Sequence, residues 1–154
     1  MTTQPIPNGW HNITAYINIK DAKTAISFYK SAFDAKEVGR ITMPDGSIAH
    51  AELQLGDSKI MLAEESEQWG NKSPQTLGGS PVSLCLYVED VDAVFAQALA
   101  AGATVADGME VKDQFYGDRT GSLTDPFGHK WTIMTHKEDV SFAEMQTRAN
   151  AMFG

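Results

Sequence analysis

The chain has 154 residues, the size of one domain, and its 12 Lys and Arg against 20 Asp and Glu give a formal charge of −8. An acidic chain is repelled by phosphate backbones, and no apolar stretch is long enough to cross a bilayer, so we expect neither a nucleic-acid nor a membrane partner. The single Cys85 excludes an intrachain disulfide, and the N-terminus lacks a signal-peptide pattern; both indicate a cytoplasmic location.

The first half of the chain predicts one β-α-β-β-β unit. Apolar residues alternate with polar ones over 13–19, which is typical of a half-buried strand. Asp21 follows as an N-cap, and apolar residues at helical spacing predict a helix that ends at Phe33. Three more strands are expected at 37–43, 48–55 and 59–63, because turn signals such as Pro-Asp-Gly and Gly-Asp separate them.

The same pattern occurs again in the second half, which indicates a duplication. The segments AYINIKDAKTAISFYKSAF and CLYVEDVDAVFAQALAAGA align when Asp21 is placed on Asp90. The predicted elements of the second copy are a strand at 82–88, a helix at 91–101, strands at 104–111 and 115–124, a turn at 125–128 and a strand at 130–135.

Two segments lie outside the copies. Residues 64–80 are polar and rich in Gly, Ser and Pro, which is typical of a linker, and they contain an isolated Trp69. Ser141 and Glu144 form a capping box that predicts a last helix. The apolar stripe of this helix is expected to pack on the body of the protein or on a second subunit: Phe142, Met145, Ala149, Met152 and Phe153.

Several long segments carry a family resemblance: AISFYKSAF, MPDGSIAHAEL, GDSKIML, VSLCLYVEDVDA and DQFYGDRTGSLTDPFGHKWTI. With them the chain resembles the vicinal oxygen chelate superfamily of glyoxalases, bleomycin-resistance proteins and extradiol dioxygenases, and within it the PhnB-like branch. The resemblance implies an α+β fold of two tandem β-α-β-β-β modules that form a U-shaped mixed sheet, with helices on the convex side and a C-terminal helix. We expect a single glyoxalase-like domain over residues 1–154, with module one at about 12–64, a linker at about 65–80, module two at about 81–136 and the helix at about 141–153.

The resemblance also implies a site on the concave face of the strands, and alternation assigns side chains to that face. If the apolar residues of these strands face the helices, as Ile17 and Leu53 do, their neighbours face the cavity. This inward-facing set is polar and aromatic: Thr14, Tyr16, Asn18, His50, Glu52, Gln54, Lys59, Met61, Ser83, Cys85, Tyr87, Thr120, Ser122, Lys130, Thr132 and Met134. Such a face lines a cleft or a wet interface, because burying it dry would leave polar groups unpaired.

The metal site of the family is expected to be absent. Metal-dependent relatives place one ligand on the first and one on the last strand of each module. The corresponding positions here are Thr14, Met61, Ser83 and Thr132. None is a His or a carboxylate, and hydroxyls with a thioether seldom hold first-row divalent ions, so we expect no metal cofactor.

His50 and Glu52 share one face of a strand, and three interpretations stay open. They are ligands of a relocated metal site completed by His129 or Asp118, a structural polar pair, or a functional pair. As a functional pair, Glu52 is a general base oriented by His50, or His50 donates to a ligand oxygen.

Cys85 is expected to be a small, semi-buried residue, since no base is spaced to activate it as a thiolate. The run Tyr116-Gly117 inside a predicted strand indicates a bulge or the close approach of another group. Arg119 either clamps an anionic ligand or pairs with Asp118 or Asp113 to hold the strand.

Two histidines are expected to be structural or peripheral. His129 follows the Asp-Pro-Phe-Gly turn and is expected to be part of it, and His136 is expected at the surface. Trp69 either packs on the nearest surface or stacks on a ligand.

We therefore expect a metal-free homodimer, the dimer being implied by the resemblance, that binds a small organic molecule, partly aromatic or oxygen-bearing, in a cleft. The expected contact residues are Tyr16, His50, Glu52, Trp69, Cys85, Tyr87, Tyr116 and Arg119. The alternative is a lyase, epimerase or glyoxalase-type enzyme in which Glu52 is the catalytic base and His50 or a metal polarises a carbonyl. A third function is an interaction module whose cleft buries the C-terminal helix of a partner subunit.

Overall fold

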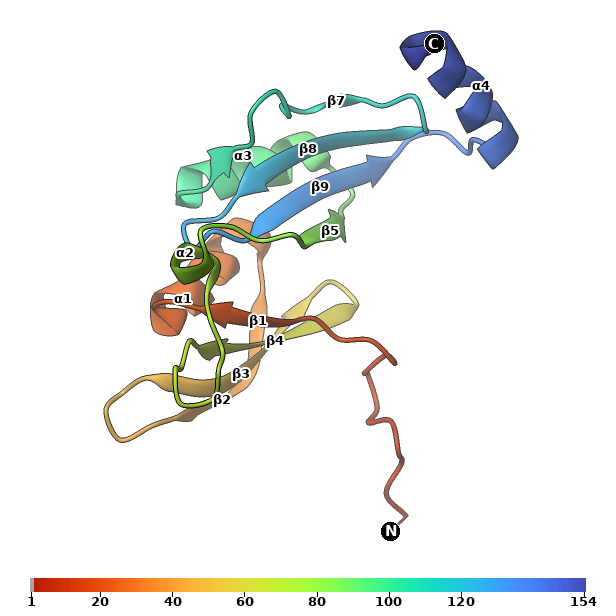
Figure 1. Ribbon diagram of the computed structural model, residues 1–154. Coiled ribbons are helices and arrows are strands. Elements are labelled where there is room, and N and C mark those ends of the chain that lie inside the picture. The colour runs from red at the N-terminus through yellow and green to blue at the C-terminus, as the bar shows by residue number, and fades with distance from the viewer. Residues whose placement is uncertain (1) are drawn as a thin grey trace. The chain divides into compact units, whose positions relative to one another are not determined.

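The computed structural model describes residues 2–154, which form two compact units, one ending at Ser80 and the other beginning at Pro81 (Figure 1). Each unit contains one β-α-β-β-β module with its own sheet, and a further helix follows the second module. The predicted α+β fold of two tandem modules and a C-terminal helix is therefore confirmed.

The first unit is a four-stranded mixed sheet with one helix packed on it. Its elements are β1 (Tyr16–Ile19), α1 (Ala22–Phe33), β2 (Lys36–Thr42), β3 (Ile48–Leu55) and β4 (Ser58–Glu64), in the sheet order β1-β4-β3-β2. β1 runs parallel to β4, and the other neighbours are antiparallel. The predicted first strand began too early: Ile13 is 90% exposed, because the ladder with β4 starts only at Tyr16.

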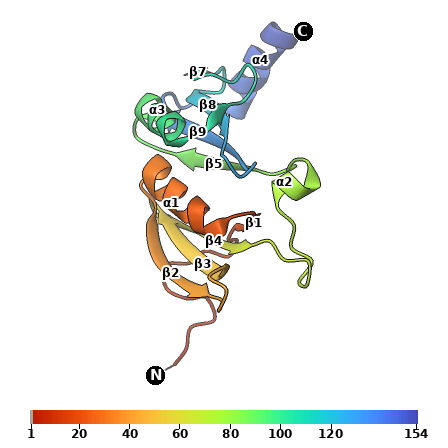
Figure 2. The ribbon, with the colours of Figure 1, turned by 90° about the vertical axis from the view of Figure 1, so that its left-hand side faces the viewer.

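The position of α1 follows from its cap and its apolar stripe. The Asp21 carboxylate accepts from the Thr24 amide, and the Glu64 carboxylate from β4 accepts from the amides of Asp21 and Ala22 at 2.9 and 2.8 Å. These donors would otherwise lack partners at the start of the helix. The stripe faces the sheet, where Ile26 and Tyr29 are fully buried; Figure 2 shows α1 across one face of the first sheet.

The polar segment 65–80 contains regular structure although its composition is typical of a linker. Ser66 and Asn71 form an isolated antiparallel bridge, and the short helix α2 (Pro74–Leu77) begins after the N-cap Ser73. Glu65 joins the two, because its carboxylate accepts from the Ser73 amide at 2.8 Å. A local network of this kind is set by side-chain contacts that composition does not reveal.

The second unit repeats the module and contains one additional short strand. It contains β5 (Ser83–Tyr87), α3 (Val91–Ala101), β6 (Thr104–Val105), β7 (Lys112–Asp113), β8 (Asp118–Thr124) and β9 (Lys130–His136). The sheet order is β5-β9-β8-β6, and β7 also pairs with β8. As in the first unit, the helix packs on one face, here against β8 and β9.

Two strand predictions in this unit were wrong. The strand predicted at 104–111 ends at Val105, because a turn from Ala106 to Met109 with Gly108 at a φ of 69° interrupts it. The strand predicted from 115 begins only at 118, because residues 114–118 form the turn between β7 and β8.

The close approach predicted at Gly117 is confirmed. Its carbonyl accepts from the amides of Lys137 and Glu138, each at 2.9 Å, and a Cβ here would overlap the Glu138 carbonyl oxygen. Its φ of 100° also favours glycine. A glycine is therefore required where the β7–β8 turn meets the chain after β9.

The last helix, α4 (Phe142–Phe153), has the expected cap but little burial. Ser141 accepts from the Glu144 amide, while Phe142 and Phe153 stay 87% and 75% exposed. The expected packing of this stripe on the body of the protein is found only in part: the Phe153 ring lies near Phe115, and Met145 and Ala149 are half-buried. Arg148 holds the helix to its unit instead, through Glu138. Within residues 2–154, no helix is long and apolar enough to cross a membrane.

Candidate functional site

The helix-free face of each sheet carries the polar side chains that alternation assigned to it. In the first unit, Ile17 and Leu53 are buried under α1, while the neighbouring Tyr16 and Glu52 are exposed or half-buried. Thr120 is the exception in the second unit, since it is 5% exposed although it lies on the helix-free face. These two faces hold most of the predicted site residues.

In the first unit, Tyr16, His50 and Glu52 form a continuous hydrogen-bonded chain. The Tyr16 hydroxyl lies 3.0 Å from His50 Nδ1, and His50 Nε2 lies 3.2 Å from Glu52 Oε1. Burial raises the pKa of Tyr16, which keeps its hydroxyl protonated and able to donate or accept a hydrogen bond at His50. The His50 and Glu52 side chains are 28% and 27% exposed. This chain can hold a polar ligand atom or carry a proton between Glu52 and solvent.

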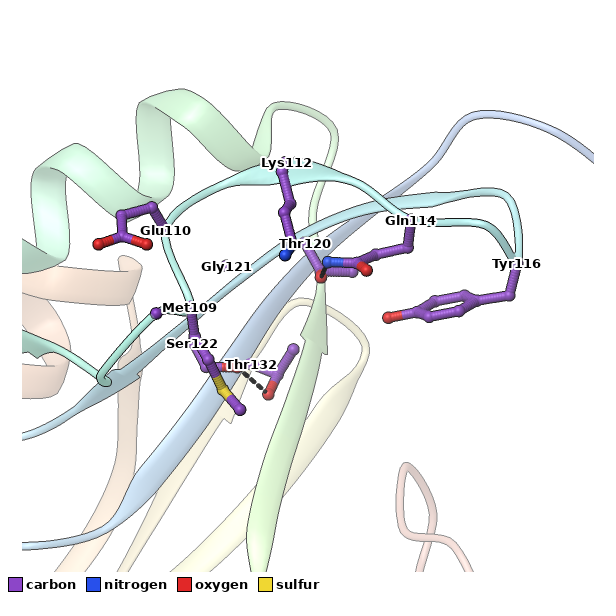
Figure 3. Close-up of a pocket in the computed structure, with 10 residues that line it drawn as sticks. Met109, Glu110, Lys112, Gln114, Tyr116, Thr120, Gly121, Ser122 and Thr132 are labelled. Atoms are coloured by element: carbon purple, nitrogen blue, oxygen red, sulfur yellow. Dashed lines mark hydrogen bonds between the residues drawn. The ribbon is translucent and has the colours of Figure 1, made fainter. Parts of the chain in front are cut away.

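In the second unit, the helix-free face is hollowed into a cavity of about 320 Å³ (Figure 3). Alternation along β8 and β9 places Thr120, Ser122 and Thr132 on its floor. Ser122 and Thr132 are paired across the ladder, with their hydroxyl oxygens 2.8 Å apart.

The opposite wall of this cavity is formed by residues 108–116, the segment between β6 and β8. Part of this segment was predicted to be strand. Figure 3 shows the Tyr116 hydroxyl, the Lys112 side chain and the Met109 thioether directed into the space, while Glu110 points away from it. The Gln114 side-chain amide donates to the Thr120 hydroxyl at 3.0 Å. The cavity thus combines hydroxyls, one ammonium group, an aromatic ring and a thioether.

Beside this cavity, a buried carboxylate joins Tyr87 to His136. Asp118 is 6% exposed and accepts from the Tyr87 hydroxyl and from His136 Nδ1, both at 2.7 Å. The hydrogen bond to Asp118 raises the pKa of Tyr87, and Asp139 and Asp118 together raise the pKa of His136. His136 is exposed, as the sequence predicted, and it is also held by two carboxylates, which the sequence did not predict. Its position in β9, two residues beyond Met134, was the available signal, because alternation puts both on one face.

The remaining predicted contact residues lie in three different places. Cys85, expected to be semi-buried, is exposed, because β5 is an edge strand with an open face; it neighbours Thr132 in the ladder. Trp69 lines a cavity in the first unit whose lining does not include Tyr16. Arg119 is held by Asp92 and by the predicted partner Asp113, with nitrogen–oxygen distances of 2.8 and 3.2 Å.

The donor set at the family's metal positions does not fit a divalent transition metal. Thr14, Met61, Ser83 and Thr132 offer hydroxyls and a thioether, and the Thr132 hydroxyl is already bonded to Ser122. Among residues 2–154, no three His, Cys, Asp or Glu side chains converge in a way that could hold a metal ion. His129 is part of the predicted turn, where its amide donates to Asp125.

Comparison with known proteins identifies relatives over most of the chain. The sequence profile of the Glyoxalase/Bleomycin resistance protein/Dioxygenase superfamily matches residues 11–133. An uncharacterized protein of Mycobacterium bovis is 44% identical over 137 residues, which cover 87% of this chain and 89% of that protein. The X-ray structure of an Arabidopsis thaliana gene product is 28% identical with a TM-score of 0.64, covering 80% of this chain and 98% of that one. A PhnB protein from Bacillus cereus, 22% identical with a TM-score of 0.62 over 81% of this chain and 99% of its own, shares the fold.

Proposed function

This chain belongs to the glyoxalase/bleomycin resistance protein/dioxygenase superfamily, and we propose that it binds a small, oxygen-bearing organic molecule in the cavity of its second unit. The observation that carries the proposal is the hydroxyl-lined floor formed by Thr120, Ser122 and Thr132. A volume of about 320 Å³ lies at the lower end of the range for small-molecule sites.

The lining also defines the kind of ligand. The Tyr116 ring offers a stacking surface, and the Met109 thioether is a soft apolar contact for a ring. Lys112, Ser122 and Thr132 offer donors to oxygen atoms of the ligand. An aromatic ring that carries adjacent hydroxyl or carboxylate oxygens satisfies both halves of the cavity. No metal takes part in this proposal, because the donor set at the family positions does not fit one.

The proposal includes a cytoplasmic homodimer. β1 and β2 are edge strands of the first sheet, and β5 is an edge of the second, so each unit presents unpaired backbone groups. Val38 and Ile41 on β2 are 51% and 61% exposed, which suits an interface better than solvent. Sedimentation equilibrium at micromolar concentration tests this part, and a monomer would contradict it.

Binding of salicylate and catechol tests the ligand proposal, with toluene as the ring without oxygen. Thr132→Val keeps the shape of the side chain and removes its hydroxyl. We expect it to weaken salicylate binding by about fivefold, the value of one hydrogen bond. Thr104→Val is the matched control, because Thr104 lies in the same sheet outside the cavity. Equal affinities of the two variants, or equal binding of toluene, would refute the proposal.

A second candidate function is an enzyme that moves a proton next to a carbonyl group, and the chain Tyr16–His50–Glu52 favours it. Glu52 would remove a proton from the carbon beside the carbonyl, and the same carboxyl group would return it. An N–H of the His50 ring would stabilise the carbonyl oxygen by a hydrogen bond.

Exchange of deuterium from D₂O into hydroxyacetone, followed by NMR, tests this candidate. Glu52→Gln should abolish exchange, whereas Gln54→Ala, on the same face of β3, should not. Exchange that persists in Glu52→Gln would remove Glu52 as the base. Wild-type protein that gives no exchange would leave ligand binding as the function.

A further inference from the structure

The first unit contains a cavity of its own, which the proposed function does not use. It measures about 460 Å³ and lies between residues 43–49, which are the β2–β3 turn and the start of β3, and residues 64–69, which are the end of β4 and the segment after it. Figure 1 shows this segment leaving β4 before α2. Trp69 forms one wall, 56% exposed, and Met43, Pro44 and Ile48 provide apolar surface.

Both walls are held by their own hydrogen bonds. The β2–β3 turn is closed by the Met43 amide to the Ser47 carbonyl at 2.8 Å. The segment that carries Trp69 is closed by two backbone bonds between Ser66 and Asn71, at 2.8 and 2.9 Å. The backbone of both walls is thus held in place before any ligand arrives, which lowers the entropy cost of binding.

The charges around this cavity are all of one sign. Asp45, Glu64 and Glu65 line it, and no Lys, Arg or His is among the described residues of the lining. Hydrogen bonds from Ser47 hold the pKa of Asp45 below its usual value, and bonds from Ser73 and Thr76 do the same for Glu65. Lys20 acts on Glu65 only from outside the lining. The Asp45 and Glu65 carboxylates are therefore negative at neutral pH, and their hydrogen-bond partners are neutral donors that leave the charge in place.

An indole face beside carboxylates suits an organic cation. The chain already uses one indole in this way, since Lys59 Nζ lies 4.9 Å from the centre of the Trp10 ring. Trp69 has carboxylates beside it and no cation in its cavity lining. An anion would be repelled here, and a neutral ring would gain only the apolar contacts.

We propose that the cavity between the β2–β3 turn and Trp69 binds a small organic cation, an ammonium group on an apolar body, with the charge over the Trp69 indole and beside Asp45 and Glu65. The site does not depend on the second-unit cavity, and its ligand has the opposite chemistry to the oxygen-rich molecule proposed there. It also gives Trp69 a role separate from Tyr16 and Tyr116.

Titration of the ¹⁵N-labelled protein with benzyltrimethylammonium tests the site, with benzyl alcohol and phenylacetate as neutral and anionic counterparts. We expect a saturable shift of the Trp69 indole signal, while the buried Trp131 of the second unit stays unchanged. Asp45→Asn should weaken binding by about two- to fivefold, as loss of one exposed charge pair does. Asp57→Asn, in the other turn of the same sheet, is the matched control and should bind as the wild type does.

Trp69→Leu provides a second variant, followed through the Ser47 and Ser66 amides, and should lose the shifts at both. Equal response to phenylacetate or benzyl alcohol would overturn the proposal, and so would an Asp45→Asn variant with wild-type affinity. Calcium chloride that reproduces the same shifts at the same concentration would overturn the assignment to an organic cation. None of these outcomes bears on salicylate binding in the second unit.

Discussion

Gly121 in β8 lies directly beneath two side chains, and its replacement by alanine should destabilise the second unit. A Cβ at this position would lie 2.7 Å from Val111 Cγ2 and 2.8 Å from Phe95 Cε2, both inside van der Waals contact. Phe95 is 7% exposed in α3, so it cannot turn away without disturbing the contact between helix and sheet. Overpacking of this kind costs about 1–3 kcal/mol. Each kcal/mol should lower the melting temperature of a unit of this size by about 4–8 °C.

Urea unfolding followed by Trp131 fluorescence measures this loss, because Trp131 is 2% exposed in the same unit. Gly39→Ala is the control: nothing lies within 4 Å of a Cβ there, so we expect a change below about 0.5 kcal/mol. A Gly121→Ala protein as stable as the wild type would refute the described packing of α3 on β8.

Two further predictions concern the second unit. Asp125→Ala should cost at least about 2 kcal/mol in urea unfolding, since the buried Trp131 indole N–H, now 2.9 Å from Asp125, loses its acceptor; an unchanged midpoint would contradict this. Asp139 and Asp118 raise the pKa of His136 above its ordinary value of 6.5, so protonation of this side chain stabilises the folded state. This stabilisation is fully present below pH 6.5 and is lost as the pH rises through the raised pKa. Melting temperatures measured between about pH 5 and 8 should fall with pH in the wild type and less steeply in His136→Gln, and parallel curves would contradict it.

The helices α1, α3 and α4 could be predicted closely from sequence because their signals are local, whereas the short helix α2 lies in a segment that was expected to be a linker. Asp21 and Asp90 each accept from an amide three residues later, and an apolar stripe follows both. The end of β6 at Val105 and the start of β8 at Asp118 could not be predicted in this way, because apolar residues continue through the turns that bound these strands. Gly108 and Gly117 marked these turns, but their positive φ is a property of the folded chain.

The faces of the strands could also be predicted, since alternation is a local property, and the shared face of His50 and Glu52 follows from it. The contact of Tyr16 with His50 joins β1 to β3 and could not be predicted from alternation. The network at Asp118 could not be predicted in the same way, because Tyr87 and His136 meet there from two different strands. Arg119 shows the same limit: Asp113 was a predicted partner, whereas Asp92, from α3, was not. Contacts between elements depend on register, which no single segment contains.

The methyl signals of the methionines test the central claim most directly. Met109 lies in the second-unit cavity, Met61 on the helix-free face of the first sheet beside Glu52, and Met152 on the exposed side of α4. Titration of ¹³C-methyl-labelled protein with salicylate should shift the Met109 signal in a saturable way and leave Met61 and Met152 in place. A Met109 signal that stays fixed while salicylate binds, or while Met61 shifts, would contradict a ligand site in the second unit.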